Sequence, residues 1–178
     1  MGVSEWNPNP APGADSGSTC RLLQNEHARR LRGLFGKAMT SEKQWTVLLV
    51  DDSEDDRYLF SYAFRSAGIQ GQIRECEDGD AAIETLQHGS RSSGGDPWPD
   101  VMFLDLKMPR RDGFEVLKWI REAGLGGSLD IYVLSGSNEP ADVQRAQALG
   151  ASEYITKPIT EQRLRQLFGR WAKRSAVN

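Results

Sequence analysis

The sequence predicts an α/β fold in which five strands alternate with five helices in one doubly wound parallel sheet. Apolar runs too short to be helices recur along the chain, and each precedes a segment with apolar residues at helical spacing. This alternation favours a parallel sheet with helices on both faces and right-handed crossovers. With 178 residues, of which 38% are apolar, the chain is long enough to bury one such core.

The strands are expected at 46–50, 73–77, 101–104, 131–134 and 153–156. The run at 101–104 is apolar throughout and is followed by Asp105, which is typical of a strand buried on both faces. The run at 73–77 has the poorest pattern.

The helices are expected after these strands, each with its own start or stop signal. Ser53 is a predicted N-cap, and Gly68 is expected to end that helix. Pro140 suits the first turn of the fourth helix. The glycines at 124–127 follow a helix instead of opening one, so they indicate a helix stop and not a phosphate cradle. The helical segments are 53–67, 80–87, 114–123, 140–149 and one whose apolar stripe is Leu164, Leu167, Phe168 and Trp171.

The chain is expected to divide into an extension (1–44), a folded domain (45–174) and a short tail (175–178). Residues 1–20 are rich in Pro, Gly, Ser and Asn, which predicts disorder. Residues 21–39 suggest a basic, roughly amphipathic helix interrupted by two glycines. Such a segment is either a loosely packed helix or linker, or a contact for a partner protein or an anionic surface.

Composition narrows the class of protein. The formal net charge of −3 disfavours direct nucleic-acid binding. Cys20 and Cys76 have no paired spacing and are expected to be free thiols in a reducing compartment. No apolar run approaches the ~20 residues of a membrane span, and no signal peptide is recognisable, so we expect a cytoplasmic protein. His27 and His88 are isolated and are not expected to donate phosphate.

Polar residues follow four of the five predicted strands. They are Asp51 and Asp52 after the first, Asp105 after the third, Ser135 after the fourth and Lys157 after the fifth. Carboxyl ends of parallel strands meet at one sheet edge, so these side chains should converge. Three neighbouring carboxylates repel one another and need a cation, and oxygen ligands suit Mg²⁺. A hydroxyl and an ammonium beside them suit phosphoryl oxygens, which makes Asp105 a candidate nucleophile for phosphoryl transfer.

The segments VLLVDD, LDLKMPRRDG, VLSGS and YITKP resemble the receiver domain of two-component response regulators. The resemblance runs from Trp45 to about Lys173, and the chain is similar in general to stand-alone receivers that serve bacterial phytochromes and other sensor kinases. It implies a flavodoxin-like fold with strand order 2-1-3-4-5.

The resemblance also implies roles at the acidic edge. Asp105 would accept a phosphoryl group from a sensor histidine kinase or a histidine phosphotransfer protein. Mg²⁺ would be held by Asp51, Asp52, Asp105 and the backbone carbonyl of Lys107. Lys107 stands at a position that relatives use to set the lifetime of the phosphoryl group.

Further roles are implied at the ends of the fourth and fifth strands. Ser135 and Lys157 would contact the phosphoryl oxygens, with Ser135 standing where many relatives have Thr. The Lys157–Pro158 bond is expected to be cis. Ser135 and Tyr154 would form the switch that reports phosphorylation.

Two enzyme classes are disfavoured by the sequence, so no enzyme activity is expected. An aspartyl phosphatase of the haloacid dehalogenase type would also use an aspartate nucleophile. Resemblance to that family would require a second Asp, as general acid, two residues after Asp105, where this chain has Lys107. A dinucleotide oxidoreductase would need a glycine-rich turn at 51–54, where this chain has DDSE.

The output is expected to be protein contact. Only a few residues follow the last predicted helix, too few for a DNA-binding module. A phosphorelay shuttle and a binding effector are both compatible with the sequence. A homodimer through the 140–149 helix, the 153–156 strand and the last helix also remains open.

Overall fold

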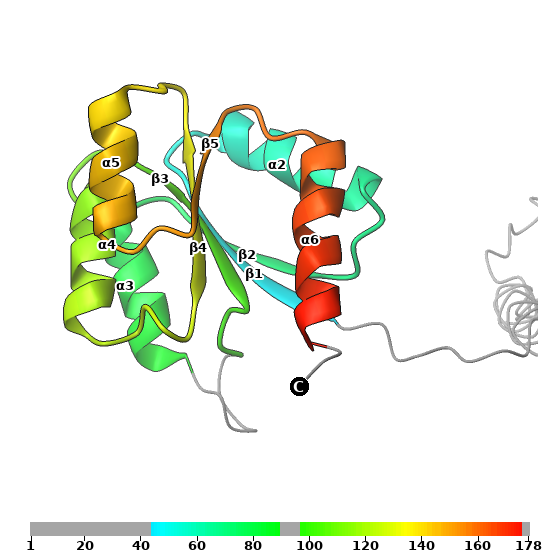
Figure 1. Cartoon of the computed structure of the whole chain (residues 1–178), viewed down its shortest axis with the longest axis horizontal. Helices are drawn as coiled ribbons and strands as arrows, with labels where there is room; N and C mark the ends of the chain where they lie inside the picture. Colours follow the sequence, from blue (N-terminus) through cyan, green and yellow to red (C-terminus); the bar gives the residue numbers. More distant parts are fainter. Residues whose placement is uncertain (1–43, 90–96, 176–178) are drawn as a thin grey trace, which may run out of the picture. The chain divides into compact units, whose positions relative to one another are not determined.

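Five parallel strands form the centre of the protein in a computed structural model that describes residues 44–89 and 97–175 (Figure 1). The strands are β1 (Trp45–Val50), β2 (Gly71–Cys76), β3 (Val101–Asp105), β4 (Asp130–Ser135) and β5 (Glu153–Thr156). Every neighbouring pair is parallel, and the order is β2-β1-β3-β4-β5. This confirms the expected strand order.

Within the described residues, five helices cover the two faces of the sheet. They are α2 (Glu54–Ser66), α3 (Gly79–His88), α4 (Gly113–Glu122), α5 (Pro140–Ala148) and α6 (Glu161–Ser175). In Figure 1, α3, α4 and α5 lie on one face, and α2 and α6 lie on the other. This is the doubly wound arrangement that the alternating pattern predicts.

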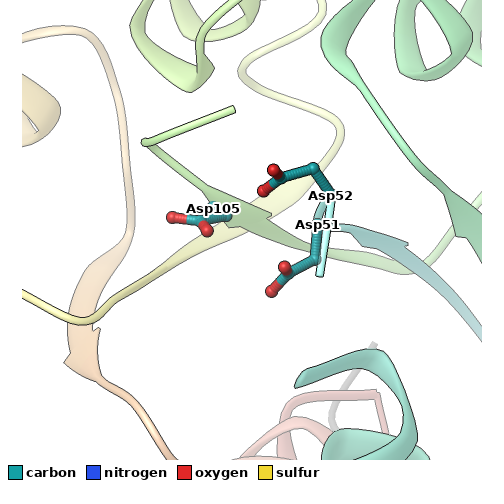
Figure 2. Close-up of side chains that lie close together, drawn as sticks. All are labelled: Asp51, Asp52 and Asp105. Carbon is teal, nitrogen blue, oxygen red and sulfur yellow. The ribbon is translucent and has the colours of Figure 1, made fainter. Parts of the chain in front are cut away.

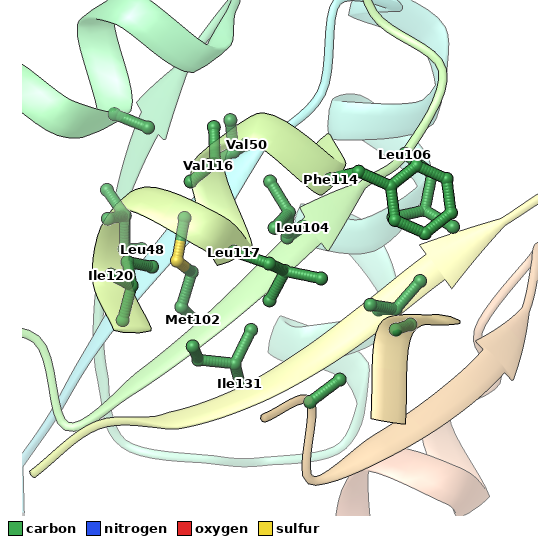
Figure 3. Close-up of a cluster of buried hydrophobic side chains, with 14 of the residues drawn as sticks. Leu48, Val50, Met102, Leu104, Leu106, Phe114, Val116, Leu117, Ile120 and Ile131 are labelled. Atoms are coloured by element: carbon green, nitrogen blue, oxygen red, sulfur yellow. The ribbon is translucent and has the colours of Figure 1, made fainter. Parts of the chain in front are cut away.

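One buried apolar cluster lies on each face of the sheet. The central strand β3 contributes side chains to both clusters, because successive side chains of a strand point to opposite faces. Met102 and Leu104 belong to the cluster beneath α3, α4 and α5, which Figure 3 shows under the apolar side of α4. Val101 and Phe103 belong to the cluster beneath α2 and α6. All five residues of β3 are buried, so the strand that ends in Asp105 is fixed on both sides.

Aromatic rings hold the last helix to the sheet. Trp171 of α6 meets Tyr132 of β4 edge-on, with ring centroids 5.0 Å apart, and Phe168 of α6 meets Trp45 of β1 at 5.2 Å. Such pairs add stability beyond the burial of their apolar area. The four apolar residues predicted to face inward on this helix are all buried.

The predicted helix signals are confirmed at several ends. The Ser53 side chain accepts a hydrogen bond from the Asp56 N–H and caps α2. Pro140 stands in the first turn of α5. Gly68 and Gly124 follow α2 and α4 with φ of +72° and +71°, a backbone conformation that glycine adopts without steric cost.

The sequence prediction was inaccurate at the start of β2. β2 begins at Gly71 instead of Ile73, because Gly71 pairs with Trp45 at the start of β1. A β-carbon at Gly71 would lie 2.4 Å from the Trp45 carbonyl oxygen, so the strand needs glycine there. On α5 only Ala146 is fully buried, while Val143 and Leu149 are partly buried.

Several predictions lie outside the described residues. They concern the disorder of 1–20, the basic segment 21–39, Cys20, His27, most of the loop before Trp98 and the last three residues. Cys76 is described and is a free, buried thiol. In the part of the chain that is described, no helix combines the length and apolarity needed to cross a bilayer.

Candidate functional site

Three carboxylates meet at the carboxyl edge of the sheet, as predicted. Asp51 and Asp52 follow β1, and Asp105 is the last residue of the neighbouring β3. Each contributes a carboxylate oxygen to a group whose atoms all lie within 4.8 Å of one another. Figure 2 shows the three side chains at these adjacent strand ends. Asp51 and Asp105 are buried and Asp52 is exposed, so the group opens to solvent on one side.

Lys157 brings a positive charge to this edge. Its Nζ lies 2.6 Å from an Asp51 oxygen, 2.7 Å from an Asp105 oxygen and 2.9 Å from an Asp56 oxygen. The backbone N–H of Lys157 donates to the Ser135 carbonyl at 2.8 Å, and the following bond to Pro158 is cis, as expected. An ammonium has three protons, so these three carboxylates can satisfy it completely.

Asp56 is a member of the site that sequence reasoning missed. In the sequence it stands three residues after the predicted N-cap Ser53, and an acidic residue in a first helical turn is common. Its carboxylate lies on α2, 101 positions before Lys157 in the chain. No spacing rule in the sequence links residues so far apart.

The pKa values at this edge follow from burial and from the shared ammonium. Burial raises the pKa of the Asp51 carboxyl, although Lys157 and the Ser53 N–H oppose it, and the Asp105 charge raises it further. Burial alone would lower the pKa of Lys157, but its hydrogen bonds to Asp105, Asp51 and Asp56 outweigh this and hold that pKa above its usual value. For Lys157, hydrogen bonds to three carboxylates outweigh the effect of burial on its pKa. For Asp51, burial outweighs the attraction of a single ammonium that it shares with two other carboxylates. Lys157 therefore stays protonated at neutral pH.

Arg57 contacts the backbone of the turn after β1 that carries Asp51 and Asp52. The sequence patterns did not indicate this role. Its buried guanidinium donates to the Asp51 carbonyl oxygen at 2.7 Å and to Glu75 of β2 at 3.2 Å. The Asp51 side chain in turn accepts the Ser53 N–H at 3.0 Å. Together these contacts fix the direction in which the turn presents its carboxylates.

The turn after β3 is also fixed by hydrogen bonds, ion pairs and close backbone packing. The Lys107 N–H donates to an Asp105 carboxylate oxygen at 3.1 Å. Gly113 begins α4 directly against the strand end, where a β-carbon would lie 2.2 Å from the Asp105 carbonyl oxygen. Arg110 pairs with Asp78, and Arg111 pairs with Asp80 at 2.6 Å, so this loop is tied to the start of α3.

Ser135 and Tyr154 meet at the backbone of Ser137. Ser135 ends β4 and is fully buried, and its Oγ accepts the Ser137 N–H at 3.2 Å. The Tyr154 hydroxyl on β5 donates to the Ser137 carbonyl oxygen at 2.7 Å. Ser137 therefore links the two side chains that are expected to form the switch.

A family model described as the response regulator receiver domain matches residues 47–168. This chain belongs to that family. Receivers are signalling modules of two-component systems that are phosphorylated on an aspartate, and they bind Mg²⁺ or Mn²⁺ in an acidic pocket. In this receiver, Asp51, Asp52 and Asp105 form an acidic group at the carboxyl edge of the sheet.

Two curated relatives match most of this receiver. The probable methanogenesis regulatory protein FilR2 of Methanothrix harundinacea (strain 6Ac) is 30% identical over 131 residues, covering 74% of this chain and 83% of that protein. The two-component response regulator ORR41 of Oryza sativa subsp. japonica is 31% identical over 124 residues, covering 70% of this chain and 91% of that protein.

Solved structures of phytochrome-associated regulators share the fold. The bacteriophytochrome response regulator AtBRR is 27% identical with a TM-score of 0.60, covering 71% of this chain and 91% of that one. The Mn²⁺-bound form of the response regulator Rcp1 is 28% identical with a TM-score of 0.60, covering 72% of this chain and 94% of that one.

Proposed function

We propose that this receiver accepts one phosphoryl group on Asp105 from the phosphohistidine of a sensor histidine kinase or a histidine phosphotransfer protein. The observation that carries this proposal is the position of Asp105. It ends the central strand within the acidic group, and its carboxylate oxygen lies 2.7 Å from the Lys157 ammonium. The likeness to AtBRR supports a phytochrome-type sensor as the source of the phosphoryl group.

The residues at the acidic edge fit a divalent cation. Three carboxylate oxygens lie within 4.8 Å of one another, and oxygen donors with an open side suit Mg²⁺ or Mn²⁺, which keep several waters. Asp51, Asp52 and Asp105 would hold the ion, together with the Lys107 carbonyl that the family resemblance implies. When bound, the ion supplies positive charge that offsets repulsion between these carboxylates and the phosphoryl oxygens.

The nucleophile in this transfer is a carboxylate oxygen of Asp105. That oxygen forms a bond to phosphorus while the P–N bond of phosphohistidine breaks, and the electron pair of the broken bond stays on the imidazole nitrogen. Lys157 then donates hydrogen bonds to the phosphoryl oxygens, since its ammonium already lies against Asp105. Ser135 supplies a hydroxyl from the next strand end.

The signal leaves through the surface formed by α5, β5 and α6. Ser135 and Tyr154 both contact Ser137 in this structure. If phosphorylation draws the Ser135 hydroxyl toward the phosphoryl group, Ser137 is released and the Tyr154 ring is free to rotate. That change alters the surface beside β5 and shifts the population that an effector or a second copy of the chain binds.

Intact-mass measurement with acetyl phosphate and Mg²⁺ tests the phosphoacceptor. We expect the wild-type protein to gain the mass of one phosphoryl group and to gain none in EDTA. Asp105→Asn should gain none under either condition. Asp55→Asn, which removes an exposed carboxylate from the first turn of α2, is the matched control and should be labelled like wild type. Labelling of Asp105→Asn would overturn the proposal.

A further inference from the structure

Asp56 contributes a fourth carboxylate next to the acidic group without belonging to it. It stands in the first turn of α2, where its own N–H is bound by the Ser53 hydroxyl at 3.2 Å. This contact fixes its backbone, and the side chain points to Lys157, with an oxygen 2.9 Å from Nζ. Its side chain is 38% exposed, whereas that of Lys157 is 14% exposed. Asp56 therefore holds Lys157 from the solvent side.

The other two partners of Lys157 are themselves in the acidic group. Asp51 and Asp105 provide oxygens to the set that fits a divalent cation. A cation bound there competes with Lys157 for these oxygens and repels the ammonium. Asp56 lies outside the group, so its attraction for Lys157 is not shared with the ion. Of the three carboxylates that contact Lys157, Asp56 is therefore the one that does not also belong to the acidic group.

We propose that Asp56 is a positioning residue that keeps the Lys157 ammonium directed at Asp105 during phosphoryl transfer. The inference rests on the proposed function, because it concerns the rate at which Asp105 is phosphorylated. It assigns no contact between Asp56 and the phosphoryl group. Asp56 acts only through Lys157, and this distinguishes it from an acidic residue that merely favours the start of a helix.

A double-mutant cycle separates these two roles. The rate of phosphorylation by acetyl phosphate is measured at saturating Mg²⁺ for wild type, Asp56→Ala, Lys157→Ala and the double variant. We expect Asp56→Ala to slow the wild-type reaction about fivefold. This corresponds to a coupling free energy in the lower part of the range for contacting residues, because Asp56 is partly exposed and is screened by water. In the Lys157→Ala background the same change should have no further effect.

Two further variants test whether the charge of Asp56 and its position matter. Asp56→Glu should restore most of the rate, because the longer side chain still carries a carboxylate. Asp55→Asn removes the same charge from the same helical turn and should leave the rate unchanged. Equal slowing by Asp56→Ala in both backgrounds, or no slowing in the wild-type background, would overturn the inference.

A second measurement does not depend on phosphorylation. In ¹⁵N-lysine NMR spectra with Mg²⁺, the Lys157 ammonium should give a protected signal in wild type and in Asp55→Asn. That signal should broaden through exchange with water in Asp56→Ala, and its persistence there would contradict the inference. Failure of the proposed function itself would appear differently, as labelling of Asp105→Asn.

Discussion

Removal of the Lys157 ammonium gives the most direct test of how the acidic edge is stabilised. In wild type this group bonds to Asp51, Asp105 and Asp56 at 2.6–2.9 Å. Lys157→Ala leaves all three carboxylates without that partner. The Asp51 and Asp105 side chains are only 2% and 9% exposed, so solvent cannot replace the lost hydrogen bonds effectively.

The expected cost follows from these burials. Breaking a buried ion pair by removing one partner costs about 3–5 kcal/mol. Asp56 is 38% exposed and its charge is screened by water, so we expect a cost at the lower end of this range. We expect Lys157→Ala to lower the free energy of unfolding by about 3 kcal/mol at neutral pH without divalent ions. Lys118→Ala is the control, because Lys118 and Glu122 are 68% and 65% exposed and 3.9 Å apart. Its cost should stay below about 0.5 kcal/mol.

Both Mg²⁺ and acid should reduce this cost. A ligand at about one hundred times its Kd stabilises the folded state by about 2.7 kcal/mol, and the variant should bind Mg²⁺ more tightly because no ammonium competes for the carboxylates. Burial already raises the pKa of Asp51, and loss of Lys157 raises it further. A carboxyl whose pKa is raised in the folded state stabilises that state below its unfolded pKa, and this stability is lost as pH rises through the folded pKa. The cost of Lys157→Ala should therefore shrink as pH falls from about 7 to about 5.

Urea unfolding followed by circular dichroism measures these changes. Wild type, Lys157→Ala and Lys118→Ala are compared in EDTA and in Mg²⁺, at both pH values. A loss below about 1 kcal/mol in EDTA would refute the claim that the ammonium compensates buried carboxylates. The same claim would be refuted if Mg²⁺ did not reduce the loss of unfolding free energy in Lys157→Ala.

Two further predictions concern neighbouring strand ends. Gly113→Ala places a β-carbon 2.2 Å from the Asp105 carbonyl oxygen, so it should cost about 1–3 kcal/mol in urea unfolding and weaken Mg²⁺ binding by calorimetry. Unchanged values in both measurements would show that α4 does not position Asp105. Ser135→Ala should still be phosphorylated, more slowly, but the amide signals of α5 and β5 should not shift on activation. If they move as far as in wild type, the proposed link through Ser137 is wrong.

Much of the fold and part of the site were predictable from local patterns. The apolar run at 101–104 indicates a strand buried on both faces, and Asp105 must then lie at its carboxyl end. Parallel strands bring their carboxyl ends to one edge, so topology alone places Asp51, Asp52, Asp105 and Lys157 near one another. The strand order came from the family resemblance, because alternation of strands and helices does not fix it.

Only the tertiary structure decided which charges pair and where the weak strand begins. Asp56 and Arg57 follow each other in one helical turn, yet Asp56 bonds to Lys157 after β5 while Arg57 bonds to Glu75 of β2. The start of β2 at Gly71 likewise depends on its pairing with β1. Periodicity shows which face of an element is apolar, since that depends on nearby residues. It cannot identify the partner of a polar side chain, because that contact depends on the path of the whole chain in space.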